Sequence, residues 1–449
     1  MGPVSHRSSG GRCRPARTGE PEMAELRKVA IVGSARIPFA RAYTGYAEEG
    51  NLSMLGAALG GLVDKYNLKG EAIGEVMAGA VLSHSRDFNL AREASLDAGL
   101  SPRTPGTNVQ IACGTSLQAA LSLGAKIATG EIDSAIAAGS DTVSDSPVVF
   151  GDKFQHRMIE LSRARTTGEK FKVFKGFNLG ELTPIAPSTQ EPRTGLSMGQ
   201  HCELMARQWE ISREEQDALA LKSHQNAARA YDEGFHDDLI VPFAGVLKDN
   251  NVRADTSLEK MATMKPAFDK SSGKGTLTAA NSTPLTDGAA SVLLAGEEWA
   301  RARGLPVLAY LTLGQVAAND FAHGEGLLMA PTIAASEMLR RSNLSFDDID
   351  LFEIHEAFAA QVLATLKAWR DPDYNRNVLG RETPLGEIDP DKINTKGSSL
   401  AYGHPFAATG ARILGLTAKL LNSTEKQRAL ISVCTAGGMG VTALVERAA

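Results

Sequence analysis

The chain has 449 residues and a formal net charge of −5, with 43% hydrophobic and 22% charged residues. This length allows two or three domains, and the composition is close to that of soluble globular proteins. Because no basic surface dominates the chain, its charge gives no reason to expect nucleic acid as a partner. No apolar run reaches the roughly 20 residues that span a bilayer, which excludes an integral membrane protein and leaves contact with a membrane surface open.

The cysteines and the N-terminus indicate the setting of the protein. The four cysteines have no close pairs and no histidine spacing of the zinc-binding kind: Cys13, Cys113, Cys202 and Cys434. We therefore expect free thiols in a reducing compartment and no metal site. Residues 1–22 are rich in Arg, Ser, Gly and Pro and lack the apolar core of a signal peptide. We expect residues 1–25 to be a disordered extension or translated sequence upstream of a start at Met23, although the arginines faintly resemble a mitochondrial transit peptide.

Strand and helix patterns alternate along the chain. The β-branched run from Lys28 to Gly33 predicts a buried strand, and the apolar spacing from Leu52 to Tyr66 predicts a helix. The stretches EVMAGAVL and NLAREASLDAGL repeat this order. Such alternation predicts an α/β fold with a parallel sheet that is covered on its faces.

Two distant stretches share the order turn, helix, strand. They run from Gln110 to Asp141 and from Tyr402 to Gly440. Two similar halves of this kind would place Cys113 and His404 at equivalent helix starts, where they can face one another across a pseudo-twofold axis. We assign residues 26–145 plus 275–297 to the N-terminal half and residues 298–449 to the C-terminal half.

Residues 146–274, between the halves, are more polar and irregular. They contain one clear amphipathic helix, which begins with a capping box at Ser212 and Glu215. We predict an inserted loop domain there. A second polar insertion, from Asp371 to Asp391, predicts a surface loop.

Cys113 stands where a strand-like run gives way to a helix-forming sequence, in VQIACGTSLQA. At a helix N-terminus the pKa of a thiol falls from ~8.5 to roughly 3.5–7.5, because the helix dipole and unpaired N–H groups favour the thiolate. This position predicts a nucleophile at neutral pH. The alternative is a small hydrophobic residue in the core.

Three further residues occupy similar junctions. His355 follows an apolar strand end in DLFEIHEAF, and His404 precedes Pro405 at a helix start. Cys434 ends a buried strand beside a glycine-rich turn whose N–H groups suit an oxyanion. Taken alone, each of them has an ordinary explanation as a packing or hydrogen-bonded residue. Together, two thiols and two imidazoles indicate acyl transfer through a thioester, with one thiolate holding the acyl group and a second thiol moving a proton at carbon.

From about Val29 to the C-terminus, the chain resembles the thiolase family. The motifs that carry the resemblance are VAIVGSARIPFAR, CGTSLQA, GTLTAANSTPLTDGAA, HEAF, GHPFAATG and CTAGGMG, in that order. The resemblance implies a thiolase fold of two similar βαβαβαββ halves packed as a five-layer αβαβα sandwich. The histidine of HEAF, the stretch RTGLSMGQHCELMA and the insertion after His355 resemble the thiolase (β) subunits of the fatty-acid oxidation trifunctional complex.

This resemblance implies a degradative 3-ketoacyl-CoA thiolase (acetyl-CoA C-acyltransferase) for medium or long chains. Cys113, activated by His404, would attack the 3-keto carbon, and Cys434 would protonate the acetyl-CoA enolate. The tetrahedral oxyanion would be held by the backbone N–H groups of Cys113 and Ala436, and the enolate by His404 and by His355 or a water that His355 holds. Thr283 would lie near the pantetheine. No cofactor would be bound, since coenzyme A is a substrate.

One stretch points to partners. Between Lys153 and Lys175 there are seven Lys or Arg against two Glu, interleaved with aromatic residues at Phe171 and Phe174. Such an element can bind an anionic membrane, a partner subunit or the CoA phosphates, or it is a solvated loop. The resemblance implies a homodimer or dimer of dimers, with a hydratase–dehydrogenase α subunit as a further partner. We expect a bacterial cytoplasmic protein, with the mitochondrial matrix as the alternative.

Two other functions stay open. A β-ketoacyl synthase-like condensing enzyme also uses a cysteine and two histidines, although Cys434 in its glycine-rich turn argues against it. A non-catalytic lipid carrier of the same fold is disfavoured because every reactive position is occupied.

Overall fold

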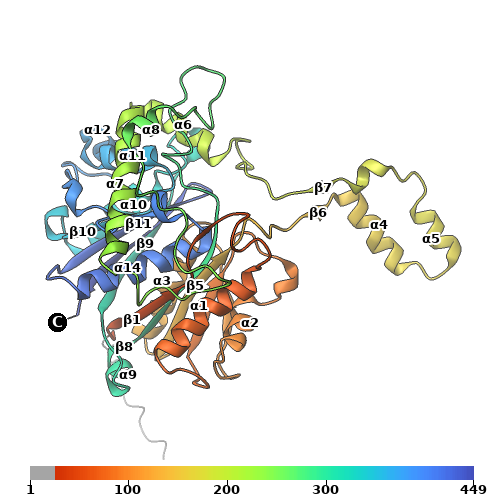
Figure 1. The fold of residues 1–449 in the computed structure, drawn as a ribbon, viewed down its shortest axis with the longest axis horizontal. Coiled ribbons are helices and arrows are strands. Elements are labelled where there is room, and N and C mark those ends of the chain that lie inside the picture. The colour runs from red at the N-terminus through yellow and green to blue at the C-terminus, as the bar shows by residue number, and fades with distance from the viewer. Residues whose placement is uncertain (1–25, 449) are drawn as a thin grey trace, which may run out of the picture.

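The computed structural model describes residues 26–448 (Figure 1). The extension expected at residues 1–25, which includes Cys13, lies outside the described residues. No helix between residues 26 and 448 is both long and apolar enough to cross a membrane.

The N-terminal part of the chain supplies one arm of the main sheet. Its elements are β1 (Val29–Arg36), β2 (Ala40–Arg41), α1 (Asn51–Lys65), β3 (Glu75–Gly79), α2 (Leu90–Asp97), β4 (Gly106–Asn108), α3 (Thr115–Ala128), β5 (Ser134–Asp141) and β8 (Thr286–Gly296). The strand order in this arm is β4, β3, β5, β8, β1, and β2 pairs with β8.

The C-terminal part supplies the other arm, in the order β9, β12, β11, β10. Its elements are α9 (Glu297–Ala302), β9 (Ala309–Ala318), α10 (Ala330–Ser342), β10 (Leu351–Ile354), α11 (Ala359–Arg370), α12 (Pro372–Asn377), α13 (Ser399–Tyr402), the 3-10 helix η6 (Phe406–Ala408), α14 (Thr409–Asn422), β11 (Arg428–Thr435) and β12 (Met439–Arg447). The two arms meet where β1 pairs with β9 at only two residue pairs, Ala30 with Tyr310 and Ile31 with Ala309.

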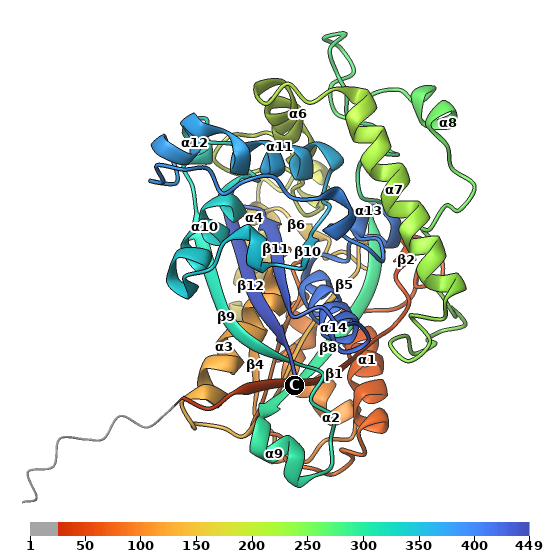
Figure 2. The ribbon, with the colours of Figure 1, turned by 90° about the vertical axis from the view of Figure 1, so that its left-hand side faces the viewer.

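Helices form the remaining layers. Helices α1 and α2 cover the outer face of the first arm, and α10 packs on β9, β12 and β11 on the outer face of the second. Between the arms lie α3 and α14, which contact each other and strands of both arms (Figure 2). The expected order of five layers, αβαβα, is therefore confirmed. Its central layer consists of the two helices whose starts carry Cys113 and His404.

The strand directions are mixed rather than purely parallel. Strands β3, β4 and β5 are parallel to one another, as are β10 and β11. The last two strands of each half are antiparallel to each other: β5 pairs with β8, and β11 pairs with β12. The general expectation of a parallel sheet is thus correct only for the strands that alternate with helices.

The second half lacks one strand of the expected βαβαβαββ pattern. Where the third strand would lie, Ile393 makes a single parallel bridge to Phe352 of β10. The next residue, Asn394, has φ 47° and its side chain takes over the pairing. Its amide donates to the Ile354 carbonyl at 2.9 Å and its oxygen accepts from the Ile354 N–H at 2.8 Å. Because a side chain satisfies these backbone groups, the strand stops after one residue.

The two polar insertions have structure of their own. Within the predicted surface loop, residues 372–377 form α12, which begins after the capping side chain of Asp371 and has proline in its first turn. The prediction of a loop is wrong for that segment. The capping box of Ser212 and Glu215 is confirmed at the start of α7.

The stretch between β5 and β8 has no strand in the main sheet. Its elements are β6 (Val149–Phe150), α4 (Asp152–Arg163), α5 (Thr167–Val173), β7 (Pro184–Ile185), α6 (Met198–Gln208), α7 (Arg213–Asp232) and α8 (Leu258–Ala262). We call residues 148–185 the projecting segment, since α4 and α5 extend from the body at the end of the β6–β7 pair (Figure 1). No residue of α4 or α5 is buried. The division of the chain into two halves and an inserted domain stays a prediction.

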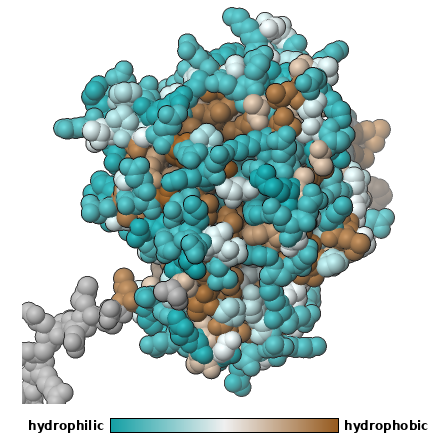
Figure 3. Space-filling model, turned by 60° about the vertical axis from the view of Figure 1, so that its left-hand side comes forward, coloured by the Kyte–Doolittle hydropathy of each residue, from teal (hydrophilic) through white to brown (hydrophobic). Residues whose placement is uncertain are grey.

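The surface of the body is not uniformly polar. Figure 3 shows apolar side chains gathered across the middle of one face, with polar side chains around them.

The crossing of α3 and α14 requires a residue without a side chain. A Cβ atom added at Gly410 of α14 would lie 2.4 Å from the Leu117 backbone nitrogen of α3. The neighbouring Ala411 N–H donates to Ser116 Oγ at 2.7 Å. The helices therefore touch through backbone, and this contact sets how close their N-termini approach.

We predict that Gly410→Ala destabilises the protein by about 1–3 kcal/mol, because the added methyl group overpacks a fixed backbone contact. Gly60→Ala in α1 is the control: its Cβ would meet no atom within 4 Å, so we expect a gain of up to about 1 kcal/mol from helix propensity. Urea unfolding of both variants measures the difference. A Gly410→Ala protein as stable as Gly60→Ala would show that the two helices do not meet in this way.

Candidate active site

Cys113 lies in a tight turn between β4 and α3, directly before the helix N-cap, Gly114. The preceding residue, Ala112, has φ 45°, a left-handed conformation that is costly for alanine. The hydroxyl of Thr115 holds the turn, since it accepts from the Ile111 N–H at 3.0 Å and donates to the Ala112 carbonyl at 2.7 Å. The strained turn thus fixes the direction in which the thiol leaves the backbone.

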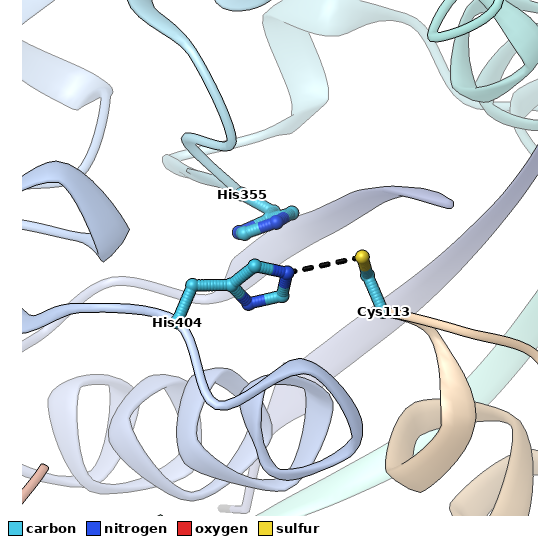
Figure 4. Close-up of side chains that lie close together, drawn as sticks. All are labelled: Cys113, His355 and His404. Atoms are coloured by element: carbon cyan, nitrogen blue, oxygen red, sulfur yellow. Dashed lines mark hydrogen bonds between the residues drawn. The ribbon is translucent and has the colours of Figure 1, made fainter. Parts of the chain in front are cut away.

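His404 lies in the turn before η6 and α14, opposite Cys113. Its Nε2 atom is 3.0 Å from Cys113 Sγ, and its Nδ1 atom is 2.5 Å from Thr409 Oγ1 (Figure 4). The turn sits closely on β5, because Asp141 accepts from the Ala407 N–H at 2.8 Å. The predicted meeting of the two helix starts is therefore present in the structure.

His355 completes a group of three. It follows β10, and its N–H donates to the Ser432 carbonyl of β11 at 2.8 Å. Its ring centroid is 4.2 Å from that of His404 (Figure 4). One ligand-type atom from each of Cys113, His355 and His404 lies within 4.8 Å of the others. Nδ1 of His355 bonds Ser399 Oγ at 2.8 Å, whereas its Nε2 has no partner among the described residues.

The backbone N–H groups of Cys113 itself and of Ala436 act on the Cys113 sulfur, since both lower the pKa of its thiol. Ala436 begins the glycine-rich turn between β11 and β12. The next N–H in this turn, from Gly437, donates to the carboxylate of Glu191 at 2.9 Å. Glu191 therefore occupies the Gly437 donor, whereas the N–H groups of Cys113 and Ala436 act on the sulfur.

Cys434 lies at the end of β11, two residues before Ala436, and is 1% exposed. Thr435, beside it, is in contact range of the Cys113 turn, since a Cβ added at Gly114 would lie 2.9 Å from its side chain. Burial raises the pKa of the Cys434 thiol well above its usual value, and the neighbouring thiols of Cys113 and Cys202 act in the same direction. The two predicted sulfur atoms thus occupy one region of the molecule.

Thr283 is half-buried beside the loop of His355. Its hydroxyl donates to the Ser399 carbonyl at 2.9 Å, and its N–H donates to the Ala357 carbonyl at 3.1 Å. The structure therefore places Thr283 next to the histidine loops, with its hydroxyl engaged by the backbone.

The protonation states differ from the sequence-based expectation of a thiolate. Burial raises the pKa of the Cys113 thiol to about 12, and the carboxylate of Asp141 acts in the same direction. Burial lowers the pKa of His404 to about 3, and the charge of Arg412 adds to this effect. Loss of hydration therefore outweighs the helix start and the two N–H groups at the sulfur. Burial therefore favours a thiol and a neutral imidazole as the resting pair.

Sequence reasoning missed the side chains that hold the site from behind. The hydroxyl of Thr409 bonds His404, and that of Ser399 bonds His355. Arg412 reaches His355 through Ser399 Oγ. The carboxylate of Glu356 accepts from Ser223 Oγ, Asn394 Nδ2 and the Leu400 N–H, which fixes the loop after His355. Thr409 and Arg412 were visible as polar residues three apart in GHPFAATGAR, a spacing that puts them on one helix face.

Comparison with known proteins agrees with this architecture. Residues 29–298 match the family model of the thiolase N-terminal domain, and residues 305–447 match that of the thiolase C-terminal domain. A 3-ketoacyl-CoA thiolase of Yersinia pestis (strain Pestoides F) is 39% identical over 425 residues, which are 93% of this chain and 97% of that protein. The 3-ketoacyl-CoA thiolase of Yersinia pseudotuberculosis serotype O:1b (strain IP 31758) matches to the same extent.

A solved structure extends the comparison to the fold. The crystal structure of the Bacillus anthracis acetyl-CoA acetyltransferase is 29% identical, with a TM-score of 0.78, and the match covers 94% of this chain and 100% of that one. Two family models in chain order, close relatives over nearly the full length and a shared fold lead to one conclusion: this chain belongs to the thiolase family.

Proposed function

We propose that this thiolase cleaves 3-ketoacyl-CoA with coenzyme A, giving acetyl-CoA and an acyl-CoA shortened by two carbons. The observation that carries the proposal is the 3.0 Å contact between Cys113 Sγ and His404 Nε2. The Ala436 N–H also acts on this sulfur, because it lowers the pKa of the thiol. The names of the 39% identical relatives support the same reaction. We further propose that the protein works in the bacterial cytoplasm, since these relatives are bacterial.

In the first step, the sulfur of Cys113 attacks the 3-keto carbon while its proton moves to Nε2 of His404. The imidazolium that forms can donate through Nδ1 to Thr409 Oγ1, the group it already contacts. The negative charge on the former keto oxygen is stabilised by the N–H groups of Cys113 and Ala436. One such preorganised donor is worth roughly 3 kcal/mol in the transition state.

The carbon–carbon bond then breaks, and its electron pair leaves with the acetyl-CoA fragment as an enolate. His355 and His404 stabilise the enolate oxygen, and Cys434 gives a proton to its carbon. The thiol of coenzyme A next gives its proton to the Cys434 thiolate, and its sulfur attacks the thioester on Cys113. The carbon–sulfur bond to Cys113 breaks, and the departing sulfur takes back its proton from His404. Thr283 is proposed to lie near the pantetheine of the bound CoA ester.

The projecting segment, residues 148–185, is where we propose that partners bind. Its exposed apolar side chains include Phe171, 77% exposed, and Leu179, 76% exposed, and they accompany the basic residues of α4 and α5. This composition favours contact with an anionic membrane or with a hydratase–dehydrogenase subunit, next to which the acyl chain would enter. The apolar area in Figure 3 supports assembly of the body as a homodimer or a dimer of dimers.

We predict that wild type cleaves medium- and long-chain 3-ketoacyl-CoA esters, and that Cys113→Ala loses more than roughly 10³-fold of the activity and forms no acyl-enzyme. Thiolysis of esters of increasing chain length measures this. Cys202→Ala removes another buried thiol and should keep activity within a few-fold. Turnover by Cys113→Ala would contradict the assignment, and activity with acyl-carrier-protein substrates alone would favour a condensing enzyme.

For Cys434→Ala, the acyl-enzyme should still form, because Cys113 and His404 are intact. Exchange of the α-protons of acetyl-CoA with solvent should slow by roughly 10²–10⁴-fold, the usual contribution of a positioned acid–base group. Proton exchange followed by NMR, beside trapping of the acyl-enzyme, separates the two steps. Unimpaired turnover and exchange in this variant would remove Cys434 from the mechanism.

The resting thiol also has a signature in pH dependence. With the pKa of Cys113 near 12, the thiolate fraction grows about tenfold per pH unit across pH 7 to 9. Iodoacetamide labelling of Cys113, read by peptide mass spectrometry, should therefore accelerate about tenfold per unit without a plateau. A resting thiolate–imidazolium pair would instead give a labelling rate that is already constant below pH 7.

A further inference from the structure

Behind His355 lies a buried arginine with a defined set of contacts. Arg412, in the first turns of α14, is 3% exposed. Its Nη2 atom donates to Ser399 Oγ at 2.8 Å and, more weakly, to Ser398 Oγ at 3.4 Å. Ser399 Oγ in turn lies 2.8 Å from Nδ1 of His355. A continuous series of hydrogen bonds therefore runs from Arg412 through Ser399 to the imidazole ring of His355.

The chemistry of these groups fixes the direction of these hydrogen bonds. A guanidinium has only donors, so Arg412 cannot accept the hydroxyl proton of Ser399. Among the described residues, Nδ1 of His355 is the remaining hydrogen-bond partner of that hydroxyl. If Nδ1 carried a proton, the buried hydroxyl proton would have no acceptor, which is unfavourable. Ser399 therefore donates to Nδ1, and the imidazole proton lies on Nε2.

The surroundings also keep His355 neutral. Burial lowers the pKa of His355 well below its usual value, and the charges of His404, when it is protonated, and of Arg412 act in the same direction. A neutral imidazole carries one N–H. That N–H is at Nε2, which has no partner among residues 26–448. The ring lies beside His404 (Figure 4).

The second histidine lacks this constraint. Nδ1 of His404 bonds Thr409 Oγ1, and the structure gives that hydroxyl no cationic donor within residues 26–448. A threonine hydroxyl can donate or accept, so His404 can gain and lose a proton at Nε2. The two rings, 4.2 Å apart, thus have different freedom: one is a fixed donor and the other can exchange a proton with Cys113.

The fixed tautomer also decides between two uses of the cluster. Cys113, His355 and His404 are sulfur and imidazole ligands of the kind that bind Zn²⁺. A metal would need a bare Nε2 on His355, which requires Nδ1 to donate. Because Arg412 makes Ser399 donate to Nδ1 instead, these hydrogen bonds favour an N–H donor over a metal ligand at Nε2 of His355.

We propose that Arg412 and Ser399 are positioning residues that hold His355 in its Nε2–H tautomer, so that it donates a hydrogen bond to the oxygen of the reacting acyl-CoA. The inference rests on the proposed thiolysis and extends it, since it names the groups that set the chemistry of His355 without touching the substrate. It also gives α14 a double role, because Thr409 and Arg412 in its first turns support the two histidines.

The tautomer is measured directly by ¹⁵N NMR of protein labelled at histidine, with the His355 signals identified by their loss in His355→Asn. In wild type we expect a protonated Nε2 and an unprotonated Nδ1. A protonated Nδ1 on His355 would overturn the proposal. This readout needs no turnover, so it stands even if wild type shows no thiolysis, which would refute the proposed function instead.

Matched variants of Arg412 test which way the hydrogen bond between Ser399 and His355 is donated. Arg412→Lys keeps a donor-only group, whereas Arg412→Gln offers an amide oxygen that can accept the Ser399 proton. We expect Lys to keep the Nε2–H tautomer and Gln to give a mixture. Identical tautomers in the two variants would contradict the role of Arg412, provided that the spectra show a folded protein.

Ser399→Ala removes the link itself. We expect kcat to fall about 10–100-fold with KM changed less than about twofold, because the lost donor acts in the transition state. Ser399→Thr keeps the hydroxyl and should restore most of kcat. A Ser399→Ala enzyme with wild-type kcat, or a loss carried by KM alone, would reduce Ser399 to a structural residue.

Discussion

The contact between Cys113 Sγ and His404 Nε2 is the interaction on which the rest of the structure depends. The two residues are 291 positions apart in the chain, and each lies at the start of a helix of the central layer. The arms of the sheet hold α3 and α14 on either side, and Gly410 lets the helices approach through their backbones. The layered fold therefore serves to bring two helix starts within one hydrogen bond.

Burial gives this contact its character. Loss of hydration makes an ion pair of thiolate and imidazolium costly, and burial shifts the pKa values of Cys113 and His404 toward their neutral forms. Reactivity then comes from arrangement: a short path for the proton, a strained turn that aims the sulfur, and N–H groups placed where negative charge develops. Because the thiol form prevails near neutral pH, we expect Cys113 to react slowly with solvent-borne reagents there and faster as the pH rises.

The same principle extends outward from the reacting atoms. His355 and His404 are chemically identical side chains whose rings lie close together, yet they have different partners behind them. A donor-only arginine fixes the proton on one ring, and a threonine leaves the other free. Two roles for two like residues thus arise from groups that do not meet the substrate.

The sequence allowed much of this to be predicted. Apolar periodicity and glycine turns indicated the first strands and helices and the helices that follow Cys113 and His404, and the similar halves implied that these two residues meet. His355 and Cys434, the other two junction residues, fall in the same region. What could not be predicted depends on tertiary contacts. The missing strand depends on the Asn394 side chain, which replaces backbone pairing across 40 positions.

The protonation of Cys113 could not be predicted either, because the sequence pattern indicates a helix start but not how deeply the thiol is buried. Ser399 and Arg412 read as ordinary polar residues until the fold places them behind His355.

The most direct measurement is the mass of the enzyme after brief mixing with 3-ketohexadecanoyl-CoA without added coenzyme A. We expect wild type to gain one tetradecanoyl group, localised to Cys113 by peptide mapping, and to release one acetyl-CoA. His404→Asn should gain almost none in the same time, because the thiol has lost its base. An acyl group on another residue, or equal acylation without His404, would contradict the central role of this pair.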